Sequence, residues 1–191
     1  MRIITKIRIE GFRSIRHLEL EGFSDFTALA GLNNAGKSNV LRALNAFFND
    51  QTDAGRLLDV DVDYFRPDIR KKKAKRIRVT LSFELPESFR IPKRIQHIED
   101  FLGGRCFEIT KEWTRKELLP AYYLNGNGPL DLEDRQKIDQ FLQLVKFRYI
   151  PNRVLPLEVV RSEHAGLRDV LVRRLGKRVT SADAFAEIGR T

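Results

Sequence analysis

The chain of 191 residues contains one cysteine, one methionine and one tryptophan, and it lacks a long run of uncharged residues. The single thiol of Cys106 excludes an internal disulfide and any zinc site built from several cysteines. The longest uncharged run spans residues 118–130 and contains prolines and glycines, so the sequence predicts no transmembrane helix. The first six residues mix charged and apolar side chains, which is not the pattern of a signal peptide. We therefore expect a cytoplasmic protein that does not bind a membrane.

Acidic residues are in the minority. Lysine and arginine number 35 against 26 aspartates and glutamates, a formal charge of +9 that favours an anionic partner such as a nucleotide or DNA. Basic residues make up most of the segment 70–78, with Lys71, Lys72, Lys73 and Lys75 among them. Two interpretations stay open for this basic run: contact with the phosphate backbone of DNA, or a solvated turn whose lysines protect the edge of a sheet.

Apolar residues form 42% of the chain, enough for a folded core, and their spacing predicts strands and helices. The segment Phe26–Ala30 is apolar throughout, as is typical of a strand buried on both faces. Asp131 is the expected N-cap of a helix. The expected strands are 4–11, 15–20, 76–85, 106–113 with a partner near 122–124, and 146–150; the expected helices are 37–49, 95–102, 132–144, 166–175 and one from Ser181.

Several residues outside these patterns have more than one interpretation. Trp113, Tyr122 and Tyr123 could stack on bases, but they are more typical of core or sheet-face aromatics, and Cys106 is expected to be a small buried hydrophobe. Asp59 and Asp63 belong to an alternating acidic segment. Because its spacing does not fit an EF-hand loop, we expect a solvated acidic loop or a partner contact in preference to a metal site.

Residues 31–38, Gly-Leu-Asn-Asn-Ala-Gly-Lys-Ser, match the pattern G-x-x-x-x-G-K-[ST] of a phosphate-binding loop. The two glycines let the backbone turn with positive φ and approach a ligand closely. Amides of such a loop, with the positive end of the following helix, form a site for an anion. We expect Lys37 to bind the β- and γ-phosphates of a nucleotide and the Ser38 hydroxyl to bind Mg²⁺. The alternative is a chance glycine turn with an exposed lysine.

Two parts of the sequence resemble the RecF/SMC-type ABC ATPases. They are the segment from Ile7 to Ile15, which includes Gly-Phe-Arg-Ser, and the loop at 31–38 with its extension to Leu41. Within that group the chain is most similar to the OLD-family (overcoming lysogenisation defect) ATPase-nucleases. Weaker similarity continues through residues 61–65, 77–84 and 147–153. The resemblance implies an α/β fold over residues 1–191: the N-terminal lobe of a P-loop ATPase head, with an antiparallel β-subdomain from about 1–25 and 76–124 and a helical and strand region over about 131–191.

The resemblance also implies ATP and Mg²⁺ as cofactors. An arginine of the Phe-Arg-Ser turn approaches the nucleotide phosphates in that family, and Arg13 occupies this position here, with a solvated hairpin arginine as the alternative. Asn39 could equally be a residue of the helix surface. The residues expected to hold the nucleotide are Arg13, Gly31, Asn33, Asn34, Ala35, Gly36, Lys37, Ser38 and Asn39.

Three family elements do not appear in the sequence: an apolar strand that ends in the Walker B acid, a signature loop and a later histidine switch. In the family these come from the C-terminal half of the head, so the catalytic base is unknown. We expect an N-terminal portion of a longer DNA-linked ATPase, from a nuclease system of antiviral defence or repair. It would hydrolyse ATP only when completed by the C-terminal half of the head or a second subunit. The alternative is a non-hydrolysing scaffold or nucleic-acid-binding module that acts through the basic run.

Overall fold

The computed structural model describes residues 3–32, 36–53, 55–68, 74–92, 95, 97–117 and 119–150. The chain divides into two compact units, Met1–Tyr149 and Ile150–Thr191, and the helices and strands described below belong to the first. The helices expected over 166–175 and from Ser181 lie outside the described residues. None of the described helices is long and apolar enough to cross a membrane.

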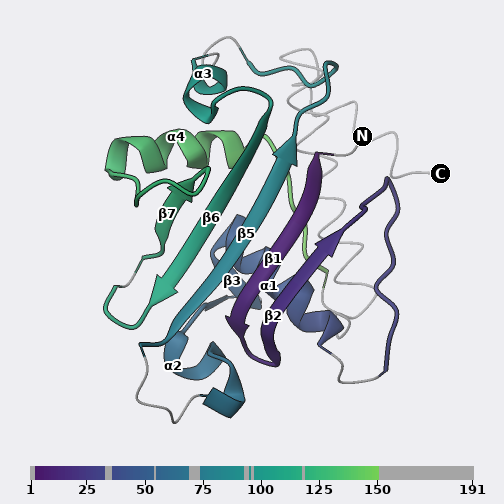
Figure 1. Ribbon diagram of the computed structural model, residues 1–191, viewed down its shortest axis with the longest axis vertical. Coiled ribbons are helices and arrows are strands. Elements are labelled where there is room, and N and C mark those ends of the chain that lie inside the picture. The colour runs from purple at the N-terminus through teal and green to yellow at the C-terminus, as the bar shows by residue number, and fades with distance from the viewer. Residues whose placement is uncertain are drawn as a thin grey trace, which may run out of the picture. The chain divides into compact units, whose positions relative to one another are not determined.

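A five-stranded antiparallel sheet with the strand order β2-β1-β5-β6-β7 forms the centre of the first unit (Figure 1). Apolar and polar residues alternate along its long strands, as expected of a sheet that buries one face. The fold class expected from the sequence, α/β with an antiparallel β-subdomain, is confirmed. The strands are β1 (Ile4–Phe12), β2 (Ile15–Glu21), β5 (Arg76–Glu84), β6 (Cys106–Thr114) and β7 (Ala121–Leu124).

Two helices cover the apolar face of the sheet, α1 (Lys37–Asn49) and α4 (Leu132–Leu142) (Figure 1). Phe141 of α4 meets two rings of the sheet edge-on, those of Phe83 and Phe107, with centroids 5.3 and 5.1 Å away. Each edge-to-face pair adds to the free energy gained by burying the rings. Trp113 and Tyr122 are buried in the same layer, which confirms them as core aromatics. Asp131 caps α4 as expected, because its carboxylate accepts a hydrogen bond from the Asp134 amide.

Charged side chains of alternating sign cross the opposite face of the sheet. Lys6 pairs with Glu19 and Glu21 of β2, and the Arg78 guanidinium pairs with Glu10 and Glu112 on the two neighbouring strands. Each pair is partly exposed and contributes little on its own. Together they place a cation opposite a carboxylate across four adjacent strands, which favours this register.

Shorter elements connect the sheet to the helices. A two-stranded sheet of β3 (Gln51–Asp53) and β4 (Arg56–Leu57) follows α1, and α2 (Val60–Asp63) and the 3₁₀-helix Arg66–Asp68 lead to β5. The helix expected at 95–102 is present as α3 (Ile98–Leu102).

The prediction that Phe26–Ala30 forms a buried strand is wrong. The segment is irregular, and the Phe26 side chain is 84% exposed. An all-apolar strand needs a neighbour on each edge and a layer on each face. The five-stranded sheet of the described residues ends at β2 and does not include this segment, in which only Leu29 packs against the core.

Two smaller predictions also fail. Residues 146–150 are not a strand, because Phe147 instead stacks on Phe48 of α1, with ring centroids 5.0 Å apart. The Phe147 carbonyl also accepts a weak hydrogen bond from Asn49 at the end of that helix. Cys106 is exposed because it opens β6 on the face away from the core, opposite Glu84.

Candidate nucleotide-binding site

The phosphate-loop motif ends where α1 begins. Gly36 is the N-cap residue with a φ of 93°, and its carbonyl accepts hydrogen bonds from the amides of Asn39 and Val40. Gly31 at the start of the motif also has a positive φ, of 151°. Both glycines adopt the backbone conformation for which the motif requires them. Asn33, Asn34 and Ala35 lie outside the described residues, so their expected contacts stay predictions.

Lys37 lies across the loop that precedes it. Its ammonium nitrogen donates hydrogen bonds to the carbonyl oxygens of Gly31, at 2.6 Å, and Leu32, at 2.7 Å. An ammonium group has three donors, and hydrogen bonds within the described residues use two of them. The Lys37 charge and the positive end of the α1 dipole therefore lie at the same place, the N-terminus of the helix.

The Phe-Arg-Ser turn between β1 and β2 lies against this end of α1. The Ser14 hydroxyl accepts a hydrogen bond of 2.9 Å from the side-chain amide (Nδ2) of Asn39. A Cβ added at Gly36 would come within 2.9 Å of the same hydroxyl oxygen. The structure therefore brings the two motifs together through Ser14 and Asn39, which are 25 residues apart in the sequence.

This contact predicts a measurable difference between two glycines. Gly36→Ala combines strain at positive φ with displacement of the Ser14 hydroxyl from its hydrogen bond with Asn39, so we expect it to lower the free energy of unfolding by about 2 kcal/mol. Gly22→Ala is the matched control, because Gly22 has a φ of 76° but no atom within 4 Å of the added Cβ. It should cost about 1 kcal/mol from strain alone. Equal losses for the two variants in urea titrations would contradict the close approach of Ser14.

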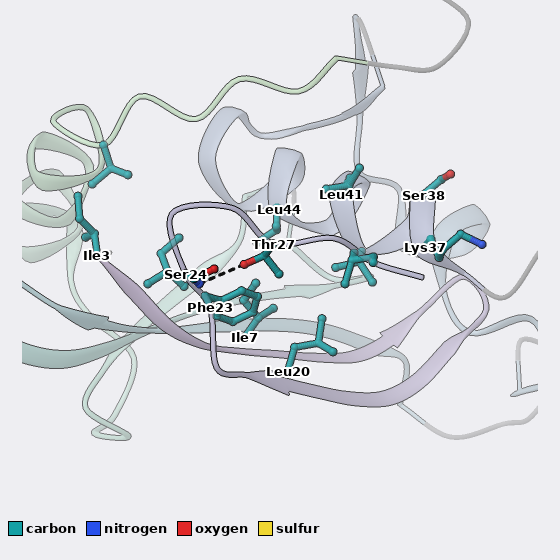
Figure 2. Close-up of a pocket in the computed structure, with 14 residues that line it drawn as sticks. Ile3, Ile7, Leu20, Phe23, Ser24, Thr27, Lys37, Ser38, Leu41 and Leu44 are labelled. Carbon is teal, nitrogen blue, oxygen red and sulfur yellow. Dashed lines mark hydrogen bonds between the residues drawn. The ribbon is translucent and has the colours of Figure 1, made fainter. Parts of the chain in front are cut away.

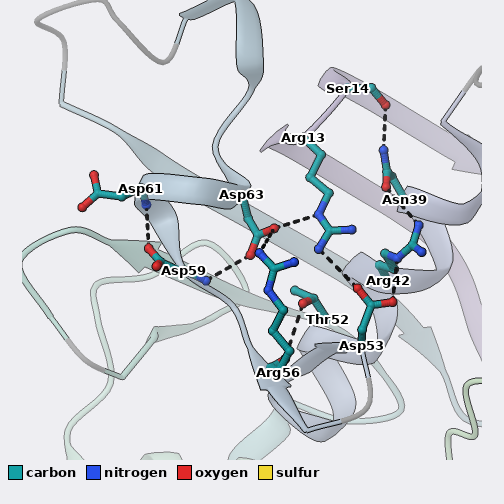
Figure 3. Close-up of polar contacts among 10 residues, drawn as sticks. All are labelled: Arg13, Ser14, Asn39, Arg42, Thr52, Asp53, Arg56, Asp59, Asp61 and Asp63. Atoms are coloured by element: carbon teal, nitrogen blue, oxygen red, sulfur yellow. Dashed lines mark hydrogen bonds and ion pairs between the residues drawn. The ribbon is translucent and has the colours of Figure 1, made fainter.

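Arg13 lies in a network of charged side chains on the flank of α1 (Figure 3). Its Nε donates to Asp63 at 2.7 Å and its Nη2 to Asp53 at 3.4 Å. Asp53 also accepts from Arg42 of α1 at 2.8 Å, and this hydrogen bond raises the pKa of Arg42. Arg13 is therefore not a solvated hairpin arginine, since only 13% of its side chain is exposed. Its predicted contact with phosphate stays a prediction.

The acidic segment meets the expectation of a solvated loop only in part, because Asp59 and Asp61 are exposed but Asp63 is buried. It forms the short helix α2, in which the Asp63 side chain is 1% exposed. Among the described residues no cluster of three or more histidine, cysteine or acidic side chains could hold a metal ion. Asp63, Asp53 and Arg42 were not predicted as site residues, and the only signal was the weak family similarity of residues 61–65.

An apolar pocket of about 570 Å³ opens beside the loop (Figure 2). The pocket runs between β1, β2 and α1, with Lys37 and Ser38 at one end. Apolar side chains supply most of the remaining wall, among them Ile7, Leu20 and Leu44. The described residues thus leave an apolar surface next to the polar end of α1.

The basic run is described only in part. Lys71, Lys72 and Lys73 lie outside the described residues, while Lys75 is half-buried just before β5. Both interpretations of this run, contact with DNA and protection of a sheet edge, therefore stay predictions.

Comparisons with known proteins agree with this site. The family model of the AAA ATPase domain, AAA_15, matches residues 1–152. An uncharacterized Methanocaldococcus jannaschii protein, MJECL44, is 27% identical over 145 residues, which cover 75% of this chain and 38% of that protein. A Helicobacter pylori ATP/GTP phosphatase is 40% identical over 42 residues, 22% of this chain and 11% of its own length. This chain therefore spans less than half the length of these relatives.

A solved structure from work on ATP-driven dimerization and DNA-stimulated activation of SMC ATPases has the same fold. It superposes with a TM-score of 0.55 at 19% sequence identity, over 91% of this chain and 99% of that one. The similarity expected from the sequence is thereby confirmed at the level of the fold, which this chain shares with an SMC ATPase. The family match, the fold and the loop at the N-terminus of α1 lead to one conclusion: the chain belongs to the AAA ATPase domain family.

Proposed function

We propose that this chain binds ATP with Mg²⁺ at residues 31–38 and is the nucleotide-binding half of an ABC-type head in a DNA-linked, OLD-like nuclease system. The observation that supports it most is the arrangement at α1: a positive-φ glycine at the N-cap, with the Lys37 ammonium held over the loop. Exposed amides and a lysine at a helix N-terminus suit a polyphosphate better than any uncharged ligand.

The residues present fit the two cofactors to different degrees. Gly36 adopts the positive φ with which the loop turns into α1, and Lys37 supplies the charge. Ser38 offers a single hydroxyl to Mg²⁺, an ion that usually keeps several waters and takes its other ligands from the phosphates. Bound Mg²⁺ would neutralise phosphate charge.

Hydrolysis would require groups that the sequence of this chain does not show, namely an acid that positions water and a signature loop. We propose that the C-terminal half of the head or a second subunit provides them and that the site closes in a dimer. The work on the SMC structure concerns ATP-driven dimerization of those proteins, which supports this proposal by analogy of fold.

The test is calorimetric titration of the 191-residue chain with ATP, with and without Mg²⁺. Lys37→Ala should weaken ATP binding about a hundredfold, because it removes the cation expected to bind the β- and γ-phosphates. Lys75→Ala is the matched control, a lysine outside the loop whose loss should leave the affinity unchanged. Equal affinities of the unmodified chain and Lys37→Ala would contradict the proposed site.

A further inference from the structure

Asp63 is a buried carboxylate shared by two arginines. Its Oδ1 accepts hydrogen bonds from Arg13 Nε, at 2.7 Å, and from Arg56 Nη2, at 3.2 Å, and its Oδ2 accepts one from the Asp59 amide at 3.1 Å. Only 1% of the side chain is exposed. Each lone pair used here fixes the carboxylate more firmly, so Asp63 is a rigid acceptor for the Arg13 guanidinium.

The segment that contains Asp63 also holds the backbone of Arg13. The Arg13 amide donates to the Asp63 carbonyl at 2.7 Å, and the Arg13 carbonyl accepts from the Arg66 amide at 3.0 Å. Arg13 has a φ of 50°, a conformation that costs free energy for a residue other than glycine. Contacts at both the backbone and the side chain thus stabilise Arg13 in a strained turn.

The charges of this network do not cancel. Three guanidinium groups, those of Arg13, Arg42 and Arg56, share two carboxylates, those of Asp53 and Asp63. Among these five side chains, arginines therefore outnumber carboxylates by one. The hydrogen bonds of Arg13 use Nε and Nη2, and within the described residues none involves Nη1. This nitrogen keeps its donors for an anion.

The turn lies where such an anion would bind. Ser14, the next residue, contacts Asn39 and approaches Gly36 at the first turn of α1 (Figure 3). We propose that Asp63 is a positioning residue of the nucleotide site: it holds the Arg13 guanidinium through Nε so that the remaining donors bind a phosphate oxygen of ATP. The inference rests on the proposed function and adds a residue to it that does not itself touch the nucleotide.

The test is a double-mutant cycle in ATP affinity, measured by calorimetry on the unmodified chain, Arg13→Ala, Asp63→Asn and the double variant. If Asp63 acts through Arg13, each single change weakens ATP binding about tenfold, and the double variant binds no more weakly than either single one. Asp61→Asn is the matched control on α2, because Asp61 pairs with the exposed Arg115, and it should bind ATP like the unmodified chain.

Two results would overturn the inference alone: single losses that multiply to about a hundredfold in the double variant, or tighter binding by Asp63→Asn, which would mean that the carboxylate competes with phosphate for Arg13. Arg13→Lys covers the case in which Asp63→Asn does not fold. Lysine keeps the charge but lacks the fork that serves a carboxylate and a phosphate together, so we expect the same tenfold loss. Unchanged affinity in Arg13→Lys would contradict the inference. Absence of ATP binding by the unmodified chain would overturn the proposed function and this inference together.

Discussion

Replacing Phe47 with alanine should lower the free energy of unfolding by about 3–5 kcal/mol. The ring is completely buried under α1, with its centroid 5.2 Å from that of Phe48 and 5.6 Å from the Lys111 ammonium. Removal of the ring leaves a cavity between helix and sheet that the surrounding side chains fill only in part. Because α1 carries Lys37 at its other end, ATP affinity should fall as well. Urea-induced unfolding followed by circular dichroism measures the first effect, and calorimetry measures the second.

Leu41→Ala is the matched control for this prediction. Leu41 lies on the same helix, but its side chain is 41% exposed, so its truncation should cost less than about 1 kcal/mol. A loss of similar size for both variants would show that α1 does not depend on its buried face.

The second large effect is expected at Lys111, a lysine that is 1% exposed in the core. Its ammonium lies 4.7 Å from the centroid of the Tyr122 ring and donates a hydrogen bond of 3.1 Å to Asp50, the residue that ends α1. Asp50→Asn removes the carboxylate that accepts from this buried ammonium, and because the Asp50 side chain is itself 57% exposed, the loss should be about 2 kcal/mol at neutral pH. Asparagine tolerates the positive φ of 56° at this position, so backbone strain does not contribute.

This loss should shrink as the pH rises. Burial lowers the pKa of Lys111 below its ordinary value, and the Asp50 carboxylate opposes this change. Between the lowered pKa and the ordinary one, the unfolded chain binds more protons than the folded chain, so stability increases with pH. In Asp50→Asn the pKa of Lys111 falls further, so the increase in stability begins at a lower pH. The stabilities of the two proteins then converge as Lys111 becomes neutral in both.

The measurement is urea unfolding of both proteins from pH 7 to about 9.5, below the ordinary pKa of tyrosine. Tyr122 has a raised pKa, chiefly because of its burial, so its ionisation would destabilise the fold above that range. Lys111→Met is the control: with no titrating group left at this position, Asp50→Asn should have little effect at any pH. A constant difference between the unmodified chain and Asp50→Asn would contradict the buried charge.

The sequence predicted correctly those helices and strands whose local pattern of apolar residues is enough to determine their secondary structure. Alternation along β5 and the apolar stripe of α1 depend only on nearest neighbours and on one buried face. Phe26–Ala30 failed because a wholly apolar segment becomes a strand only if other strands pair with it, which composition cannot reveal. The strand predicted over residues 146–150 is wrong for a related reason, because the local sequence pattern does not reveal the contact of Phe147 with Phe48.

The residues of the candidate site also divide into those that the sequence pattern identifies and those that only the tertiary fold identifies. The loop motif defines Gly36, Lys37 and Ser38 from spacing alone, and the structure places them at the start of α1. The role of Asp63 could not be predicted, because it depends on a turn fifty residues earlier in the chain. An acidic residue in a polar segment is usually exposed, and only the tertiary fold shows that this one is buried under two arginines.

The charged side chains on the face of the sheet opposite the helices affect how the sheet can associate with another chain. β2 is an edge strand whose outward side chains include Glu19 and Glu21, already engaged by Lys6, and β7 at the other edge has only four residues. Short or highly charged edges discourage another chain from adding a strand by backbone pairing. Within the described residues, the two edges of the sheet are therefore poor templates for a further strand, so fibrous association through them is disfavoured.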